Sequence, residues 1–350
     1  MRWFDPLLLP FSLGYGLATR LRNHLFDIGF KKSVKFAVPT IVVGNLSMGG
    51  TGKTPFVEFL IDLLSEQFQL TTLSRGYGRK SRGYFLADKS SDASKIGDEP
   101  FQIYEKYGNK VNVAVGEERV LAIPQILLAC PETDLILLDD AFQHRYVAGD
   151  YQILLTTFHK PFFQDQILPL GTLRESRIGA TRADLIVVTK CPKSIDLASK
   201  NEYVKQIRIY NEKAKILFVG IKYGKPSSRG AEPLDKLSSV VAVSGIANDA
   251  LFVEQARQHF EVNHHFSYSD HHHYKISDVE KIAQKCRELP NSVILTTEKD
   301  AVKLKAPIFR DYLAEIPIFA WPIAIDIKEE DSAFVKQAII TIIKEKGYQK

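Results

Sequence analysis

The sequence is poor in cysteine and has no close pair of cysteines. Three cysteines stand far apart among 350 residues, without the spacing of a disulfide framework or of a cysteine-based zinc site. This usage fits a reducing cytoplasm. The apolar run near the start, residues 7–18, is shorter than the roughly 20 residues that a helix across a bilayer needs. No small-residue cleavage motif follows it, so we expect no cleaved signal peptide.

The sequence also lacks a strong excess of charge of one sign. Its 46 Lys and Arg and 41 Asp and Glu leave a formal net charge of +5. Such a small excess suits anionic ligands such as nucleotides, phosphates or acidic lipid surfaces, but it does not indicate nucleic acid, and we expect no nucleic-acid partner. A content of 45% hydrophobic and 25% charged residues excludes an intrinsically disordered chain.

Short apolar runs alternate with helical patterns along the chain. This alternation predicts an α/β fold of the P-loop NTPase type, with a mostly parallel sheet covered by helices on both faces. We expect an N-terminal amphipathic helix in residues 1–30, a P-loop kinase domain in 31–225 and a second, smaller α/β domain in 226–350. The expected strands are 39–44, 70–74, 134–139, 152–156, 184–190, 215–223, 239–245, 291–297 and 316–325, and the later helices lie near 249–259, 277–287 and 331–346.

The N-terminal segment combines leucine and aromatic residues with nearby basic residues. Asp5 and Pro6 favour a helix start, Pro10 predicts a kink, and Gly29 favours a stop. Such a helix either lies in the interface of a bilayer or docks on the protein's own core.

The strongest local signal is the glycine-rich stretch of residues 44–55, which follows an expected strand and opens a helix. Its glycines leave backbone N–H groups free to turn toward phosphate oxygens. Lys53 is placed to reach the β- and γ-phosphates, and the Thr54 hydroxyl to hold Mg²⁺. Ser47 stands where the general G-x-x-x-x-G-K-[ST] pattern has glycine.

An acidic pair, Asp139 and Asp140, ends the expected strand 134–139. Alone, such a pair is more often a helix cap or a solvated turn. Together with Lys53 and Thr54 it indicates the Mg²⁺ side of a nucleoside triphosphatase or a kinase.

Two segments are candidates for the group that activates an acceptor hydroxyl. Residues 96–101 form a short acidic loop with Asp98, and residues 268–274 contain a histidine cluster, 271–273. A carboxylate that holds a histidine makes a competent base. Asp98 could instead simply start a helix, and the histidines could bind zinc, although their spacing is not that of a usual zinc ligand set.

Seven motifs in order give the sequence a resemblance to the tetraacyldisaccharide 4′-kinases, the lipid A 4′-kinases of Gram-negative bacteria. They cover nearly the whole chain, and Ser47 matches this family's own version of the glycine-rich loop. The motifs are residues 43–55, 73–79, 97–100, 139–145, 168–175, 270–273 and 297–301.

The resemblance implies ATP and Mg²⁺ as cofactors and the lipid A disaccharide 1-phosphate as acceptor. It implies a catalytic pair of Asp98 and His271, with Lys53 also catalytic, although His272 and His273 leave the choice of histidine open. The nucleotide-binding residues it implies are Gly49, Gly50, Thr51, Gly52, Lys53, Thr54, Gln143 and Arg174. The implied metal ligands are Thr54, Asp139, Asp140 and Glu175, and the implied substrate-binding residues are Asn45, Arg75, Tyr77, Arg119 and His144.

The same resemblance implies a peripheral enzyme, expected to be a monomer, on the cytoplasmic face of the bacterial inner membrane, and domain closure is expected to assemble its site. Two rival functions remain at this point. One is a P-loop ATPase or GTPase that acts as a switch or metal-delivery chaperone. It predicts hydrolysis without an acceptor, yet the sequence has no guanine-reading N-K-x-D, and residues 297–300 are only a near match. The other is a kinase of a soluble small molecule, which leaves the apolar N-terminus unexplained.

Overall fold

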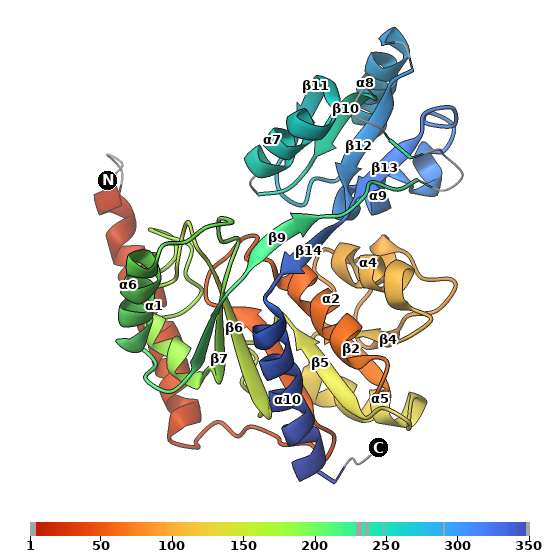
Figure 1. Cartoon of the computed structure of the whole chain (residues 1–350). Coiled ribbons are helices and arrows are strands. Elements are labelled where there is room, and N and C mark those ends of the chain that lie inside the picture. Colours follow the sequence, from red (N-terminus) through yellow and green to blue (C-terminus); the bar gives the residue numbers. More distant parts are fainter. Residues whose placement is uncertain (1–4, 229–232, 235–237, 248, 290, 348–350) are drawn as a thin grey trace.

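The protein is described by a computed structural model that covers residues 5–228, 233–234, 238–247, 249–289 and 291–347. The chain forms two α/β units, and a two-stranded ribbon connects the second unit to the first (Figure 1). The expected α/β class with two layers of helices is confirmed. Residues 1–4 of the expected N-terminal segment lie outside the described residues.

The larger unit is built on an eight-stranded sheet with the strand order β3-β4-β2-β5-β1-β6-β7-β8. All neighbours pair in parallel except the edge strand β3, which is antiparallel to β4. The strands β1, β2, β5 and β7 are buried along their whole length, and β1, β5 and β7 are mainly apolar, as expected for a sheet covered on both faces. The strands are β1 (Thr40–Asn45), β2 (Leu70–Ser74), β3 (Phe85–Leu86), β4 (Asn112–Val115), β5 (Leu135–Asp139), β6 (Tyr151–Thr157), β7 (Leu185–Thr189) and β8 (Lys215–Phe218).

Helices cover both faces of this sheet and create two separate cores. On one face lie α2 (Lys53–Leu64), α4 (Asp98–Tyr107) and α10 (Glu329–Glu345). On the other lie α5 (Arg119–Ala129), η1 (Arg177–Arg182) and α6 (Leu197–Arg208). The short α3 (Ala93–Ile96) precedes α4. The last helix therefore packs on the first unit, although it follows the whole second unit in sequence (Figure 1).

The smaller unit has a four-stranded parallel sheet in the order β11-β10-β12-β13. Its strands are β10 (Ser239–Ser244), β11 (Glu261–Ser267), β12 (Val293–Thr297) and β13 (Ile318–Trp321). Helix α7 (Ala250–His259) covers one face, and α8 (Ile276–Glu288), α9 (Glu298–Leu304) and η2 (Pro307–Phe309) cover the other.

Two stretches that the sequence predicts as single strands each divide into two. Residues 215–223 form β8 and then β9 (Gly220–Tyr223), and residues 316–325 form β13 and then β14 (Ile323–Asp326). Strands β9 and β14 pair with each other in an antiparallel ribbon between the two units. Pro322 lies between β13 and β14, where its missing N–H prevents a continuous ladder. The chain thus leaves the first unit along β9 and returns along β14.

The first helix, α1 (Asp5–Asp27), ends just before Gly29, as expected, and contains Pro10. Its inward face is mainly polar: Ser12 donates to the carbonyl oxygen of Ile167, and Asn23 is buried. Its outward face is apolar and exposed, with Leu7, Phe11, Leu13, Leu17 and Leu21. Within the described residues, no helix combines the length and the apolar character needed to cross a bilayer.

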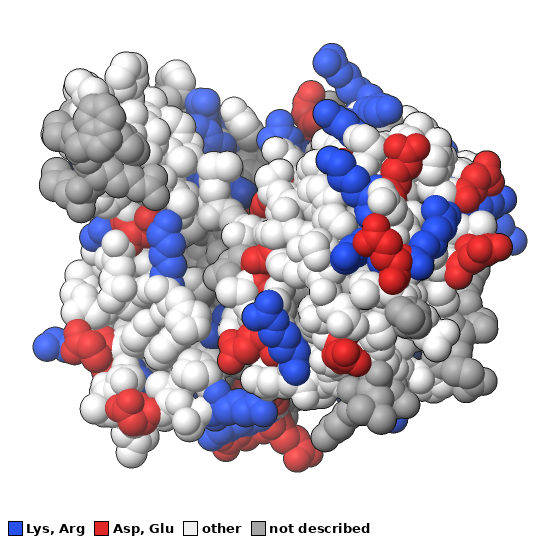
Figure 2. Space-filling model, turned by 90° about the horizontal axis from the view of Figure 1, so that it is seen from above, with Lys and Arg blue, Asp and Glu red and all other residues white. Residues whose placement is uncertain are grey.

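On the face of the molecule shown in Figure 2, basic and acidic side chains are interspersed. This mixture agrees with the small net charge of +5.

Candidate nucleotide and acceptor site

The glycine-rich loop connects β1 to α2 at the carboxyl edge of the large sheet. Gly49 and Gly52 take positive φ angles of 103° and 82°, which the turn requires and which other residues rarely adopt. Inside the loop, Asn45 Nδ2 donates to Thr51 Oγ1 at 2.7 Å. The N-terminus of α2, with its unpaired N–H groups, follows Gly52 directly and makes an anion-binding site.

One carboxylate forms ion pairs with both of the cationic side chains that are predicted to bind the nucleotide. Asp140 lies 3.5 Å from Lys53 Nζ and 2.9 Å from a guanidinium nitrogen of Arg174. Although burial alone would raise it, these two cations hold the pKa of Asp140 below its usual value. The predicted residues Lys53, Asp140 and Arg174 therefore form one cluster at the mouth of the loop.

The neighbouring Asp139 is buried, and its Oδ1 has no hydrogen-bond partner. Burial, reinforced by the charge of Asp140 and opposed by Lys53, raises the pKa of Asp139 to about 7. A buried carboxylate oxygen without a partner, next to Asp140 and near Lys53, is the donor chemistry that Mg²⁺ prefers. No group of three or more His, Cys, Asp or Glu within the described ranges is arranged to hold a metal, so phosphate and water oxygens would complete the set. These residues fit Mg²⁺.

Glu175 occupies a different setting. Its buried carboxylate accepts hydrogen bonds from Asn23 of α1, from Gln143 at 2.9 Å and from Arg182 at 2.7 Å. Gln143 also donates to the carbonyl oxygen of Asn45. These contacts support a positioning role for Glu175 and Gln143 behind the loop, and metal binding by Glu175 stays a prediction. Sequence reasoning missed Asn23 and Arg182, which have no motif of their own.

Three predicted residues form a basic cluster near the acidic pair. Burial lowers the pKa of Arg119 to about 10. The negative charge of Asp140 opposes this shift, and the positive charge of Arg75 adds to it. Burial, with the charge of Arg119 next in size, lowers the pKa of His144 to about 4. His144 is therefore neutral at pH 7, and its Nε2 is buried without a partner. The cluster offers positive charge to a phosphate, and the neutral imidazole offers one further polar contact.

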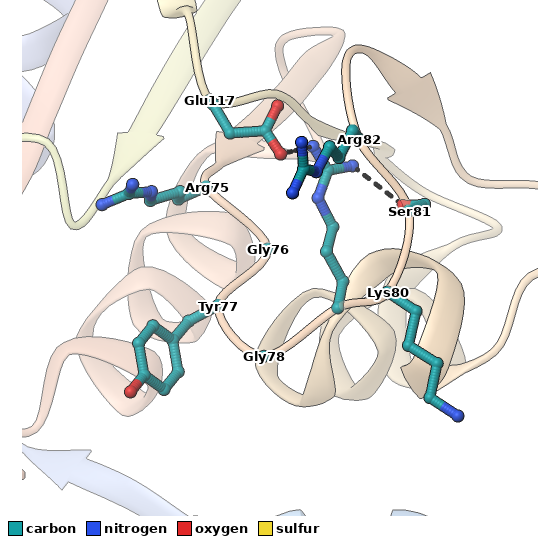
Figure 3. Close-up of a pocket in the computed structure, with 9 residues that line it drawn as sticks. Arg75, Gly76, Tyr77, Gly78, Lys80, Ser81, Arg82 and Glu117 are labelled. Carbon is teal, nitrogen blue, oxygen red and sulfur yellow. Dashed lines mark hydrogen bonds and ion pairs between the residues drawn. The ribbon is translucent and has the colours of Figure 1, made fainter.

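The loop that carries Arg75 and Tyr77 is folded around one arginine. Arg79 pairs with Glu117 at 2.6 Å and donates to the carbonyl oxygen of Gly83. Figure 3 shows Arg75 and Tyr77 extending away from Glu117, while the hollow of the loop opens beside them. Tyr77 is 64% exposed, so most of its surface is open to a ligand.

On the acceptor side, Asp98 begins α4 directly after Gly97, as the alternative of a helix start expects, and its catalytic role stays a prediction. Its carboxylate pairs with Lys303 Nζ of α9 at 3.0 Å. The same lysine donates to the carbonyl oxygen of His272. The first residue of α4 is thus held by the second unit.

His271 lies on the surface that faces the first unit. Its Nε2 is 3.1 Å from Lys299 Nζ of α9, and its ring meets Tyr77 edge to face at a centroid distance of 5.0 Å. Burial, followed by the charge of Lys299, lowers the pKa of His271. Asp98 and His271 are therefore each held by a lysine, and these two lysines lie one turn apart on α9.

The other two histidines of the cluster have different surroundings. His272 contacts Asp278 at 2.9 Å and stacks on Tyr268, beside the start of α8. His273 is exposed. These contacts favour His271 as the histidine that faces the acceptor. Lys299 and Lys303 were missed as site residues, although Lys299 lies within the motif of residues 297–301.

The near match to a guanine-reading motif has a structural explanation. Thr297 caps α9, where its side chain accepts from the N–H of Asp300. The buried Asp300 carboxylate accepts from the N–H of Gly245 at 2.9 Å. Residues 297–300 therefore form a helix start in the second unit.

A strand, a glycine-rich turn and a helix, with two carboxylates at the end of the adjacent strand β5, define a P-loop nucleotide-binding protein. The family model for tetraacyldisaccharide-1-P 4′-kinase matches residues 4–343. The chain belongs to this family of kinases, as the seven motifs predicted.

Individual relatives agree with this assignment. The chain is 43% identical to the tetraacyldisaccharide 4′-kinase of Flavobacterium psychrophilum, over 91% of this chain and 92% of that protein. It is 40% identical to the protein of the same name from Bacteroides thetaiotaomicron, over 97% and 93%. Among solved structures, LpxK from Aquifex aeolicus in complex with ATP matches with a TM-score of 0.75 and 29% identity, over 97% of this chain and 99% of that chain.

Proposed function

We propose that this kinase transfers the γ-phosphoryl group of ATP to the 4′-hydroxyl of tetraacyldisaccharide 1-phosphate, giving lipid IVA. The proposal rests on two sets of residues, one from each unit. The phosphate loop with Lys53 and Arg174 belongs to the first unit, and the imidazole of His271, from the second, contacts Tyr77 on the loop after β2, at the same carboxyl edge of the large sheet. A triphosphatase that acts on water needs no such second set.

On the nucleotide side, the backbone of residues 49–52 and the N-terminus of α2 bind the phosphates. Lys53 and Arg174 stabilise the charge that develops on the transferring group, once phosphate oxygens replace Asp140 as their partner. Thr54, Asp139 and Asp140 would hold Mg²⁺, which neutralises phosphate charge when bound.

On the acceptor side, Asp98 and His271 position the 4′-hydroxyl and take its proton as the oxygen bonds to phosphorus and ADP leaves. The lowered pKa of His271 keeps the imidazole neutral and able to accept. Because Lys303 and Lys299 hold the two groups in the present arrangement, catalysis requires a shift of α9 against α4. We assign this shift to domain closure around the acceptor.

The test of this assignment is Asp98→Ala, assayed with labelled ATP and the disaccharide 1-phosphate in detergent. We expect transfer to the lipid to fall by about 10²–10⁴-fold, the usual contribution of a general base, with ATP affinity unchanged within about twofold. Asp92→Ala, which removes an exposed aspartate that caps α3, is the matched control. Loss of ATP binding in the Asp98 variant would move this residue to the nucleotide site instead.

We further propose that the enzyme works as a monomer bound peripherally to the cytoplasmic face of the inner membrane through α1. The helix presents exposed Phe11 and Leu17 to the outside, while Asn23 and Arg22 tie its other face to the first unit. A helix that docks through polar groups and exposes leucines has the pattern of an interfacial helix.

The membrane proposal is tested with the double substitution Phe11→Ser and Leu17→Ser, which leaves the docking face intact. Each side chain contributes about 1.5–3 kcal/mol when buried, so co-sedimentation with anionic phospholipid vesicles should weaken by about a hundredfold or more. Leu128→Ser is the control, because Leu128 is 84% exposed but lies on α5. Equal vesicle binding by wild type and double variant would exclude α1 as the anchor.

A further inference from the structure

Helix α1 reaches the nucleotide site at two neighbouring residues. The hydroxyl of Tyr15 donates to the backbone carbonyl oxygen of Arg174 at 3.0 Å, and the side-chain amide of Asn23 donates to the carboxylate of Glu175. Arg174 is one of the two cations that pair with Asp140 beside the phosphate loop. The helix with the exposed apolar outer face therefore contacts, through its inner face, the segment that carries a nucleotide-binding arginine.

This segment is paired with the first half of the phosphate loop. Residues 46–48 and residues 172–174 lie side by side in the antiparallel sense. The N–H of Arg174 donates to the carbonyl oxygen of Leu46 at 2.7 Å. Because Glu175 is the next residue, a contact that holds its carboxylate also fixes the end of this pairing.

The carboxylate of Glu175 is buried and depends on its donors. Only 2% of Glu175 is exposed, and a buried carboxylate is costly unless hydrogen bonds compensate it. Gln143 and Arg182 donate to Oε1, whereas Asn23 is the only donor to Oε2 within the part of the chain that the structure describes. A carboxylate can only accept, so the amide of Asn23 turns its nitrogen to it, and Asn23 Oδ1 is left buried without a partner. The pairing with Glu175 therefore decides the orientation of the Asn23 side chain.

A second route leads from Glu175 into the phosphate loop. Gln143 Nε2 donates both to Glu175 Oε1 at 2.9 Å and to the carbonyl oxygen of Asn45 at 2.8 Å. Asn45 is the last residue of β1, where the phosphate loop begins. Helix α1 also holds Gln143 directly, because Arg22 donates to its backbone carbonyl oxygen at 2.8 Å. Asn23, Glu175 and Gln143 thus form a continuous hydrogen-bonded chain from α1 to the loop.

We propose that Asn23 is a positioning residue for phosphoryl transfer, which acts through Glu175 to set Arg174 and Gln143 against the phosphate loop. Helix α1 then belongs to the nucleotide site as well as to the lipid-facing surface. The inference rests on the proposed phosphoryl transfer and deepens it, because a helix that only anchors the protein needs its apolar face and no contact with the nucleotide site. A displacement of about 1 Å at a reacting centre can lower the rate about a hundredfold.

The first experiment is Asn23→Ala, which removes the amide and keeps a good helix former in α1. Because the hydrogen bond to the Glu175 carboxylate is lost, we expect kcat for transfer to the disaccharide 1-phosphate to fall about tenfold or more, and the affinity for MgATP about fivefold or more. The KM for the lipid and co-sedimentation with anionic phospholipid vesicles should stay within about twofold of wild type, since the apolar face is unchanged.

Thr19→Ala is the matched control, because the Thr19 hydroxyl donates to the carbonyl oxygen of Gly16 within α1 and not to the nucleotide site. This variant should leave all four quantities within about twofold of wild type. If Asn23→Ala changes only vesicle binding and the KM for the lipid, α1 is an anchor alone and the proposal is overturned.

An exchange of donor and acceptor tests the pair itself. Asn23→Asp removes the donor and puts a second carboxylate against Glu175, so we expect a loss of kcat at least as large as in Asn23→Ala. When Asn23→Asp is combined with Glu175→Gln, the amide introduced at 175 can donate to the carboxylate introduced at 23, while its oxygen still accepts from Gln143 and Arg182. The double variant should recover kcat to within about threefold of wild type. A double variant no more active than Asn23→Asp overturns the proposal.

The MgATP measurement needs no lipid acceptor, so this inference and the proposed function can fail separately. If the wild type binds MgATP but leaves the disaccharide unphosphorylated, the proposed function fails, while the loss and recovery of MgATP affinity in these variants still decide the role of Asn23. If the wild type phosphorylates the disaccharide and every Asn23 variant matches it, only the present inference fails.

Discussion

Single residues of the site are set by partners that lie far away in the chain. Asp98 is held by Lys303, and Glu175 by Asn23, over separations of more than a hundred residues. Motifs predicted the residue types, because phosphate and Mg²⁺ binding require a fixed local spacing on one turn. They did not predict the lysines of α9, since an ion pair between two units leaves no periodic mark in the sequence.

The charge of Lys299 is expected to control the acid limit of catalysis. Because Lys299 helps to lower the pKa of His271, Lys299→Gln should raise that pKa, so that protonation stops the reaction at a higher pH. A profile of kcat/KM from pH 5 to 8 should show its acid limb displaced upward. Lys305→Gln, an exposed lysine on the turn after α9, is the control, and an acid limb shared by all three proteins would argue against His271 as the base.

Single elements were predicted well where a local apolar run was enough to specify them. Strands β1, β5 and β7 begin and end within about two residues of the expected bounds, as do α7, α8 and α10. The division of residues 215–223 and 316–325 was not predicted. An apolar run is compatible with one strand or with two, and only the pairing of β9 with β14 decides between them.

We predict that position 44 on β1 must be glycine, because the turn after β5 packs closely against β1 there. A Cβ at this position would lie 2.7 Å from Phe142 Cβ and 2.9 Å from its backbone N, and the backbone cannot give way cheaply. Gly44→Ala should therefore lower the free energy of unfolding by about 1–3 kcal/mol, measured as a fall in melting temperature.

The matched control is Gly14→Ala in α1, where nothing lies within 4 Å of the added methyl group. Alanine is the better helix former, so this change should be neutral or stabilise by up to about 1 kcal/mol. Equal melting temperatures for the two variants would mean that the contact at Gly44 is relieved at little cost.

At the scale of the whole molecule, the two units meet through α4 and α9. Three ion pairs join these helices: Asp98 with Lys303, Glu99 with Lys299, and Lys106 with Glu298. We propose that residues 329–345 belong structurally with the first unit, since Val335, Ile339 and Ile343 fill its core. On this view the smaller unit is an insertion between β9 and β14, which moves on its ribbon when the site closes.

Reversal of one charge at this junction should open the molecule. In Glu298→Lys, a cation replaces the carboxylate that lies 3.2 Å from Lys106 Nζ, which costs about 0.5–1 kcal/mol for a partly exposed pair. We expect a larger radius of gyration in small-angle scattering at low salt and a return toward wild type at high salt. The neutral Glu298→Gln should lie between the two, and scattering curves that do not differ would show that this pair does not hold the units together.

The position of α10 also constrains how the protein is made. Three of the side chains that complete the core beneath β1 follow the whole smaller unit in the sequence. During translation those residues are made after the inserted half, so the nucleotide-binding half, although begun first, cannot close its interior until the inserted half has been synthesised. The inserted half, complete in sequence before then, is free to fold ahead of it.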